Sequence, residues 1–164
     1  MHITIRHVEP DDYRPLQALY AMPGVIAGTL QLPMPSELLW KNRLTSQSAN
    51  EKVLVAVVEG RVVGHLGLHL HTNLRRRHSA YIGMAVHDEW QGKGIGSRLM
   101  EACLDLADNW LNLLRIELTV FADNAPALRL YDKYGFVREG LQKAYGYQNG
   151  VYKDALLMAR LKTG

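Results

Sequence analysis

Residues 87–100, HDEWQGKGIGSRLM, place three glycines within five positions and then continue as an amphipathic helix pattern. Residues 79–86 before them alternate like a β-strand. Because glycine weakens helices and strands alike, such a cluster predicts a special backbone conformation between a strand end and a helix start. Unpaired N–H groups and the positive end of the helix dipole lie there, which suits a phosphate. We predict a phosphate-binding loop; the alternative is a loop tightened only for packing.

This loop differs from two common nucleotide-binding motifs. No Lys-Ser/Thr pair follows the last glycine, so the loop is not of the Walker type. The dinucleotide fingerprint would read G-x-G-x-x-G, which is also absent. Lys93 and Arg98 could add positive charge at the edge of the loop. Alone, the loop names no particular ligand.

Composition limits the classes of protein that the chain can belong to. The 164 residues fit one domain, predicted over 1–164, with 48% hydrophobic residues and a net charge of +3. No apolar run approaches the roughly 20 residues of a membrane span, and the first residues lack a signal-peptide pattern, so we expect a cytoplasmic protein without a membrane partner. The small positive charge is weak evidence for nucleic acid, and residues 75–77 are interpreted as a solvated turn. The single cysteine, Cys103, has the spacing of a buried apolar residue.

The order of strand and helix patterns predicts a mixed α/β sheet flanked by helices. Strands are expected at 2–8, 79–86 and 115–121, with a hairpin around Glu59-Gly60 and another around Asn149-Gly150. Helices are expected from about 12 to 22, 36 to 44, 95 to 111 and 124 to 134. Residues 22–35, with three prolines and two glycines, are the least regular part, and we look there for specificity.

A second motif lies in residues 117–136, ELTVFADNAPALRLYDKYGF. Asn124 and Tyr131 are separated by two helical turns, so they share one face of a helix. They could contact one elongated ligand at two points. Asn124 could also simply cap the helix, and Tyr131 could simply pack in the core.

Together the two motifs resemble those of the GCN5-related N-acetyltransferases (GNAT). Residues 91–96, QGKGIG, match the Q/R-x-x-G-x-G/A signature, and residues 124–136 resemble the downstream motif. The expected element order also fits over nearly the whole chain. The segments TLQLPMPSELLW, VVGHL and RIELTVFADNAPA are similar to bacterial L-amino-acid N-acetyltransferases.

The resemblance implies a GNAT-like acyltransferase fold, acetyl-CoA as co-substrate and a small amine as acceptor. The implied cofactor-binding residues are Met84, Val86, Gln91, Gly92, Lys93, Gly94, Ile95, Gly96, Ser97, Asn124 and Tyr131. Tyr131 is the implied general acid, donating its proton to the departing CoA thiolate, and attack by the amine is direct. No metal is required, and a homodimer through edge strands is possible.

The general base is less clear from the sequence. Relatives that acetylate ribosomal-protein amino termini carry a glutamate where this chain has Thr119. Glu117 lies on the same strand face and could act through water, although a solvated or ion-paired Glu117 is an equal alternative. A free α-amine, with a pKa near 8, needs less help than a lysine amine with a pKa near 10.4. The sequence therefore favours α-amines slightly.

Further side chains leave the acceptor open. His65, His69 and His71 share a strand face, but their spacing makes a poor metal site, and His65 could face the acceptor. Tyr145, Tyr147 and Tyr152 could line the same pocket or decorate a sheet edge. We predict acetylation of an L-amino acid. The alternatives are a protein amino terminus or polyamine as acceptor, or a catalytically silent acyl-CoA-binding module.

Overall fold

The computed structural model describes residues 1–163, which form a seven-stranded sheet flanked by helices. The strand order is β1-β2-β3-β4-β5-β7-β6, and only β4 and β5 pair in parallel. The predicted fold class, a mixed and mostly antiparallel sheet with helices, is confirmed. The strands are β1 (Thr4–His7), β2 (Glu51–Val58), β3 (Arg61–Leu70), β4 (Ser79–Val86), β5 (Arg115–Phe121), β6 (Val137–Gln148) and β7 (Val151–Leu161).

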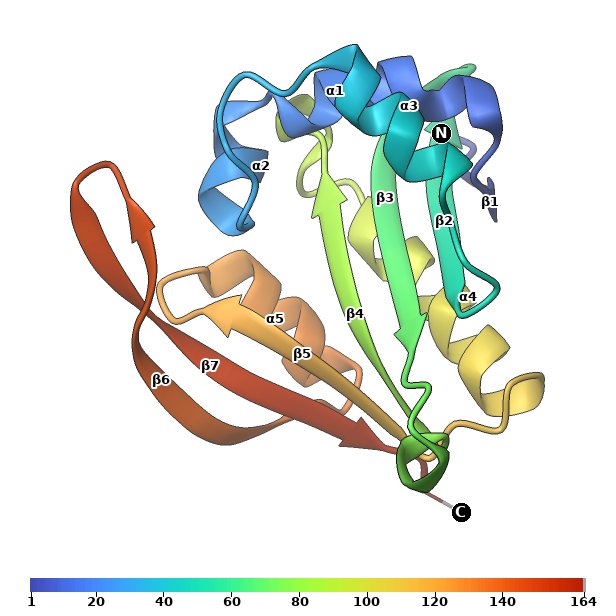
Figure 1. Ribbon diagram of the computed structural model, residues 1–164, viewed down its shortest axis with the longest axis vertical. Helices are drawn as coiled ribbons and strands as arrows, with labels where there is room; N and C mark the ends of the chain where they lie inside the picture. The colour runs from blue at the N-terminus through green and yellow to red at the C-terminus, as the bar shows by residue number, and fades with distance from the viewer. Residues whose placement is uncertain (164) are drawn as a thin grey trace.

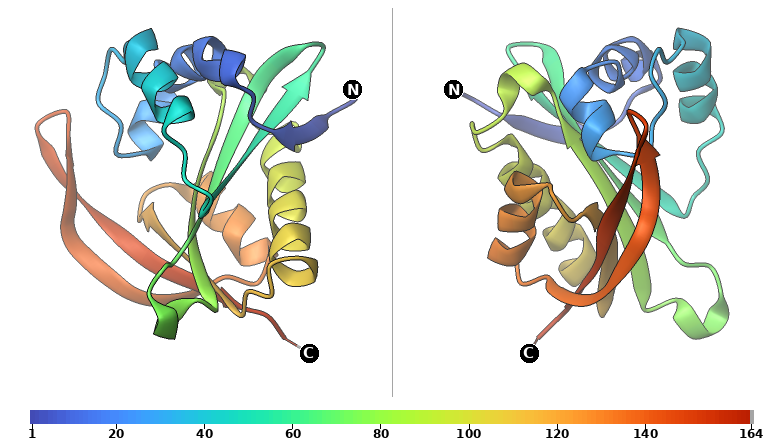
Figure 2. Two further views of the ribbon diagram at one scale, coloured as in Figure 1. Left: turned by 45° about the vertical axis from the view of Figure 1, so that its right-hand side comes forward. Right: turned by 90° about the vertical axis from the view of Figure 1, so that its left-hand side faces the viewer.

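The helices cover both faces of the first strands (Figures 1 and 2). One face carries α4, which packs on β2 and β3, while α1 packs on β3 from the other face. Figure 2 shows α1, α2 and α3 together on the side of β2–β4 that α4 does not occupy. The helices are α1 (Tyr13–Tyr20), α2 (Pro23–Gly28), α3 (Glu37–Thr45), α4 (Ile95–Asn109) and α5 (Ala125–Lys133).

The core is divided between these two faces. The larger cluster contains Leu66, Leu99 and Ile116 and lies between the sheet, α4 and α5. The smaller cluster contains Leu16 and Trp40 and lies beneath α1 and α3. Each amphipathic helix buries its apolar stripe against the sheet, as the sequence periodicity requires. Cys103 is a buried member of the larger cluster, as predicted.

The central strands separate from each other over half of their length. β4 and β5 are paired only from Ser79 to Tyr81 and from Arg115 to Glu117. Beyond these residues they diverge, and one edge of β4 from Ile82 to Val86 has no neighbouring strand (Figure 1). Backbone N–H and C=O groups along such an edge remain available to a ligand.

One expected irregular segment contains a helix. The sequence predicted no regular structure in residues 22–35, but Pro23 begins α2, which ends at Gly28. Proline fits the first turn of a helix because its fixed φ suits the helix and its missing N–H removes no bond there. The helix is short because the glycine at position 28 and the prolines at positions 33 and 35 prevent its continuation. No helix within residues 1–163 is long and apolar enough to cross a membrane.

Candidate active site

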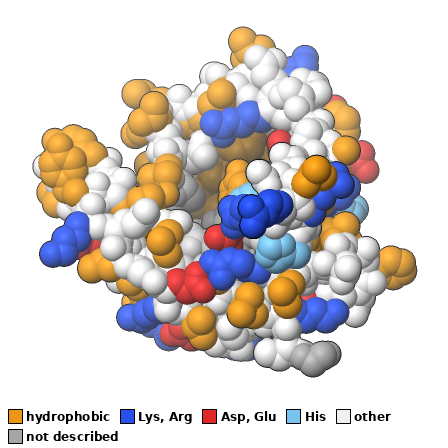
Figure 3. All heavy atoms as spheres, turned by 60° about the horizontal axis from the view of Figure 1, so that its bottom comes forward, with side chains coloured by type: hydrophobic (Ala, Val, Ile, Leu, Met, Phe, Trp, Pro, Cys, Tyr) orange, Lys and Arg blue, Asp and Glu red, His pale blue; other side chains and the backbone are white. Residues whose placement is uncertain are grey.

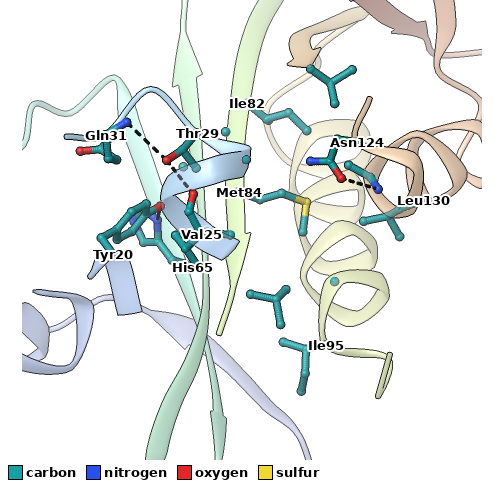
Figure 4. Close-up of a pocket in the computed structure, with 18 of the residues that line it drawn as sticks. Tyr20, Val25, Thr29, Gln31, His65, Ile82, Met84, Ile95, Asn124 and Leu130 are labelled. Carbon is teal, nitrogen blue, oxygen red and sulfur yellow. Dashed lines mark hydrogen bonds between the residues drawn. The ribbon is translucent and has the colours of Figure 1, made fainter. Parts of the chain in front are cut away.

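A cavity of about 1170 Å³ opens where β4 and β5 diverge. Its walls come from α2, α3, the free edge of β4, the residues before α4, and α5. Figure 3 shows this hollow lined largely by hydrophobic side chains, with charged side chains gathered below it. Figure 4 shows Tyr20 and His65 on one side of the cavity and Asn124 and Leu130 on the other. The cavity therefore joins segments that are far apart in the sequence.

The predicted phosphate loop forms one end of this cavity. Gly92 and Gly94 have positive φ angles of 70° and 83°, and a Cβ built on either would meet nothing within 4 Å. Gly94 caps α4, so the first N–H groups of that helix face this open space without intrahelical partners. The backbone conformation and the open space both fit an anionic group, as the sequence predicted.

The side chains of the loop have structural partners. Gln91 Nε2 donates a hydrogen bond to the Val86 carbonyl at 2.7 Å, so Gln91 ties the loop to the end of β4. The Lys93 ammonium lies 4.9 Å from the Trp90 ring centroid and does not line the cavity. Ser97 lines the cavity, and its hydroxyl accepts a hydrogen bond from Lys133 Nζ at 3.3 Å. The loop thus presents backbone rather than side chains to a ligand.

The second motif lies across the cavity from β4. Asn124 caps α5 by accepting a hydrogen bond from the Ala127 N–H at 3.3 Å, and it also lines the cavity. The two interpretations of Asn124 are therefore compatible. Tyr131 lies two turns further along α5, is only 7% exposed and lines the same cavity, and burial raises its pKa to about 12. Its hydroxyl is consequently protonated at neutral pH.

The structure separates Glu117 from this cavity. Its carboxylate lies in a second, smaller pocket, bonded to His71 Nε2 at 2.9 Å and paired with Arg76 and Arg115. Burial raises the pKa of this carboxyl, but the hydrogen bonds from His71 and Arg76 and the neighbouring positive charges outweigh it, so the pKa is lowered. A carboxylate held by three cationic or hydrogen-bonding partners is a weak base. This geometry corresponds to the ion-paired alternative for Glu117.

Three aromatic side chains form the opposite end of the cavity, and we call Tyr20, Trp40 and His65 the aromatic corner. The rings of Tyr20 and Trp40 stack at 4.6 Å, and His65 meets both edge-on. The Tyr20 hydroxyl and His65 Nδ1 are 2.6 Å apart (Figure 4). Burial, with smaller contributions from His69 and Arg43, lowers the pKa of His65 to about 4, so the ring is neutral at pH 7. Burial likewise raises the pKa of Tyr20.

The remaining histidines and tyrosines have separate environments. His69 stacks on Tyr81 at 4.5 Å, so the three histidines do not converge on one point. Within residues 1–163, no group of three or more His, Cys, Asp or Glu side chains could hold a metal ion. Tyr145 lines the cavity, whereas Tyr147 and Tyr152 lie outside it, with their rings in contact at a tilt of 47°. The sequence therefore indicated His65 and Tyr145 as possible lining residues, and both line the cavity. It did not indicate Tyr20, Trp40 or Arg43, which also line it.

Helix α2 connects the two ends of the cavity. Its Gly24 N–H donates to Asp88 Oδ2 at 2.9 Å, just before the phosphate loop. At its other end, a Cβ on Gly28 would lie 3.3 Å from Asn124 Nδ2. The helix is thus a wall shared by the loop, by α5 and by the aromatic corner, which explains why an irregular sequence segment is part of the site.

Comparison with known proteins decides the family. The model of the Acetyltransferase (GNAT) family matches residues 13–136. The chain belongs to the GNAT acetyltransferase family. It is 46% identical to the L-amino acid N-acetyltransferase AaaT of Escherichia coli K12, over 98% of each chain.

Solved structures of GNAT proteins have the same fold. An acetyltransferase of the GNAT family from Streptococcus pneumoniae has a TM-score of 0.83 and 28% identity, covering 98% of this chain and 99% of its own. The spermidine N-acetyltransferase of Vibrio cholerae in complex with CoA and spermine has a TM-score of 0.86 and 27% identity, covering 97% of this chain and 95% of its own. The GNAT fold expected from the two motifs is confirmed.

Proposed function

We propose that this GNAT protein transfers an acetyl group from acetyl-CoA to the α-amine of an L-amino acid. The observation that carries the proposal is one continuous cavity that joins the glycine loop, the free edge of β4 and Tyr131 to a separate aromatic corner. The 46% identity to an L-amino acid N-acetyltransferase supports the acceptor class. Both ends of the cavity are needed for this reaction, because the acetyl group and the amine must meet between them.

The residues around the cavity fit acetyl-CoA, which supplies the acetyl group as a thioester. The amides of residues 92–97 would hold its pyrophosphate, where a Cβ at Gly92 or Gly94 would occupy open space. The free edge of β4 near Met84 and Val86 would hydrogen-bond the pantetheine arm, with Asn124 on the other side. A backbone N–H of β4 would stabilise negative charge on the carbonyl oxygen.

Tyr131 is the proton donor in this proposal. Its protonated, buried hydroxyl is carried by a helix that lines the cavity, and it would give its proton to the leaving sulfur. The nitrogen loses one proton as the amide forms, and that proton would restore the Tyr131 hydroxyl. An α-amine with a pKa near 8 is partly neutral at physiological pH. This neutral fraction of the acceptor can attack without a base in the cavity. His65, with its pKa of about 4, is too weak a base to add much at pH 7.

The test is CoA thiol release from acetyl-CoA over a panel of apolar amino acids, polyamines and short peptides. Turnover that is fastest with amino acids supports the proposal. Turnover only with spermidine or only with peptides would show that the acceptor is a polyamine or a protein amino terminus. If no amine is acetylated but calorimetry shows that CoA binds, the protein is a non-catalytic acyl-CoA-binding module.

A further inference from the structure

The aromatic corner carries one positive charge above it. The Arg43 guanidinium carbon lies 4.8 Å from the Trp40 ring centroid, and its Nη1 donates to Gln31 Oε1 at 2.9 Å. Arg43 and Gln31 both line the cavity, and they come from α3 and from the segment between α2 and α3. Arg43 is exposed, and these two neutral groups place its guanidinium at the edge of the cavity.

Most of the hydrogen-bonding capacity of Arg43 is not used by other protein groups. A guanidinium has five N–H donors, and only the bond to Gln31 is present for Arg43 within residues 1–163. Arg43 has no ion pair in that range either, whereas Arg6, Arg115 and Arg160 each bind a carboxylate. The planar guanidinium of an arginine without an anionic partner can bind a carboxylate through two parallel hydrogen bonds.

The charged side chains that line the cavity also indicate the end with the aromatic corner as the site for an anion. The described lining contains two cationic side chains, Arg43 and Arg129, and Arg129 lies on α5 on the cofactor side. Arg43 is close enough to lower the pKa of both Tyr20 and His65, so its charge acts on the aromatic corner. These two side chains are neutral at pH 7, so Arg43 supplies the positive charge beside the aromatic corner, while the Glu51 carboxylate, also in the lining, acts on His69.

A second donor near Arg43 lacks an acceptor. The indole Nε1 of Trp40 is the one buried side-chain nitrogen or oxygen within residues 1–163 that has no hydrogen-bond partner. The Trp40 side chain is only 4% exposed and lines the cavity beneath Arg43. A buried donor without an acceptor destabilises this end of the cavity, but the nitrogen is enclosed, so it describes the packing under Arg43 and is not a contact for a ligand.

We propose that Arg43, positioned by Gln31 and by the face of Trp40, binds the α-carboxylate of the acceptor amino acid. This inference rests on the proposed function and adds the group that distinguishes an amino acid from a simple amine. Apolar lining residues are left for the acceptor side chain, among them Val25, Leu30, Phe121 and Tyr145. The lining contains two acidic residues, Glu51 and Asp88. Asp88 is bonded to the Gly24 N–H, and neither forms an ion pair with Arg43 within residues 1–163.

The same arrangement selects against polycations. A polyamine has no carboxylate and would place a second ammonium group near the Arg43 guanidinium, which like-charge repulsion disfavours. Neutral amines of the same shape would lose the charge-assisted hydrogen bonds but suffer no repulsion. The expected order of kcat/KM is therefore apolar amino acid, then its decarboxylated amine, then spermidine.

The experiment compares each of L-leucine, L-methionine and L-phenylalanine with the amine that lacks its carboxylate. The variants are Arg43→Gln, Arg43→Lys and a matched control, Lys41→Gln, which removes the same charge from the same helix but lies outside the cavity lining. Arg43→Gln should raise KM for the amino acids about 10- to 100-fold and change KM for the amines less than about threefold. Arg43→Lys should recover part of the loss.

Direct binding distinguishes this inference from the proposed function. Calorimetric titration of the CoA-loaded protein with the same amino acids should show the loss of affinity in Arg43→Gln but not in Lys41→Gln. An unchanged amino-acid affinity, or an equal loss for amino acids and amines, would overturn the role of Arg43. Wild-type protein that binds amino acids through Arg43 without acetylating them would overturn the proposed function alone.

Discussion

The two halves of the cavity recognise their ligands by different means. The cofactor half, made of β4, residues 91–97 and α5, offers backbone N–H groups, a free strand edge and glycines with positive φ. The acceptor half, made of α1–α3 and the facing part of β3, offers side chains, namely the aromatic corner and Arg43. Backbone recognition depends on a local conformation, whereas side-chain recognition depends on how distant segments meet.

This difference teaches where specificity can change. A loop of glycines can hold the same phosphate in many proteins because its amides are the same whatever the neighbouring residues are. The acceptor half can be altered one side chain at a time without disturbing that loop, because the side chains come from other elements. Mutations in one half should therefore affect mainly one ligand, and the following predictions test this separation.

The largest expected effect is at the junction of the halves. Tyr131→Phe removes the proposed proton donor while keeping the buried ring, so kcat should fall about 100- to 1000-fold. The affinity for CoA, measured by calorimetry, should change less than about threefold. Tyr147→Phe, on the exposed hairpin outside the cavity, is the control. A Tyr131→Phe enzyme with near wild-type kcat would show that another group protonates the sulfur.

A smaller effect concerns the stability of the acceptor half. The pKa of His65 is about 4 in the folded protein against an ordinary value of 6.5, so the unfolded chain binds the proton more readily. Its contribution is therefore fully present above pH 6.5 and is lost as the pH falls toward 4. Between pH 7.5 and 5 the wild type should lose about 2 kcal/mol more unfolding free energy than His65→Gln.

Urea denaturation of both proteins at the two pH values measures this difference. The carboxyl groups with lowered pKa, at Asp12, Asp108 and Glu117, titrate below this window and contribute little to it. Identical pH dependence of the two proteins would mean that His65 is not held neutral by burial.

The cofactor half should respond to a change of backbone freedom. Gly94→Ala strains a residue with a φ of 83° and adds a methyl group to the space facing the loop, so the Kd for CoA should rise about 10-fold. Gly60→Ala is the matched control, because Gly60 has a φ of 77° and equal space but lies in the β2–β3 turn. The KM for the amino acid should stay constant in both. Equal CoA affinity in the two variants would contradict the proposal that the loop holds the pyrophosphate of CoA.

The smallest expected effect separates Glu117 from the chemistry. Glu117→Gln removes a carboxylate that is already paired with Arg76 and Arg115 outside the large cavity, so kcat should stay within about twofold of wild type. Initial rates from pH 6 to 9 should rise with the neutral fraction of the amine in both proteins. A tenfold loss of kcat with a shifted pH profile would restore Glu117 as a base acting through water.

The sequence predicted the cofactor half better than the acceptor half for a physical reason. β4 and β5 have the bounds expected from alternation, and the loop that begins α4 lies where the glycines indicated. These features depend on short-range conformation, which neighbouring residues determine. The separation of β4 from β5 was not predicted, because no local pattern encodes the loss of strand pairing.

Local sequence patterns could not predict which side chains from distant segments come together. Tyr20, Trp40 and His65 are contributed by three elements, so their meeting depends on the tertiary fold. Glu117 was assigned to the correct strand face, yet its partner Arg76 comes from a turn whose approach to β5 depends on the tertiary fold. The irregular segment 22–35 was a useful signal, since it contains both α2 and Gln31.

The position of α2 has a thermodynamic consequence. This six-residue helix is bonded to Asp88 beside the phosphate loop and lies against Asn124, while its Val25 faces the acceptor end. Two ligands that contact the same helix are thermodynamically linked. If the first changes the affinity for the second by some factor, the second changes the affinity for the first by the same factor. We expect CoA to tighten amino-acid binding and the amino acid to tighten CoA binding by the same factor, through a helix that takes no part in the chemistry.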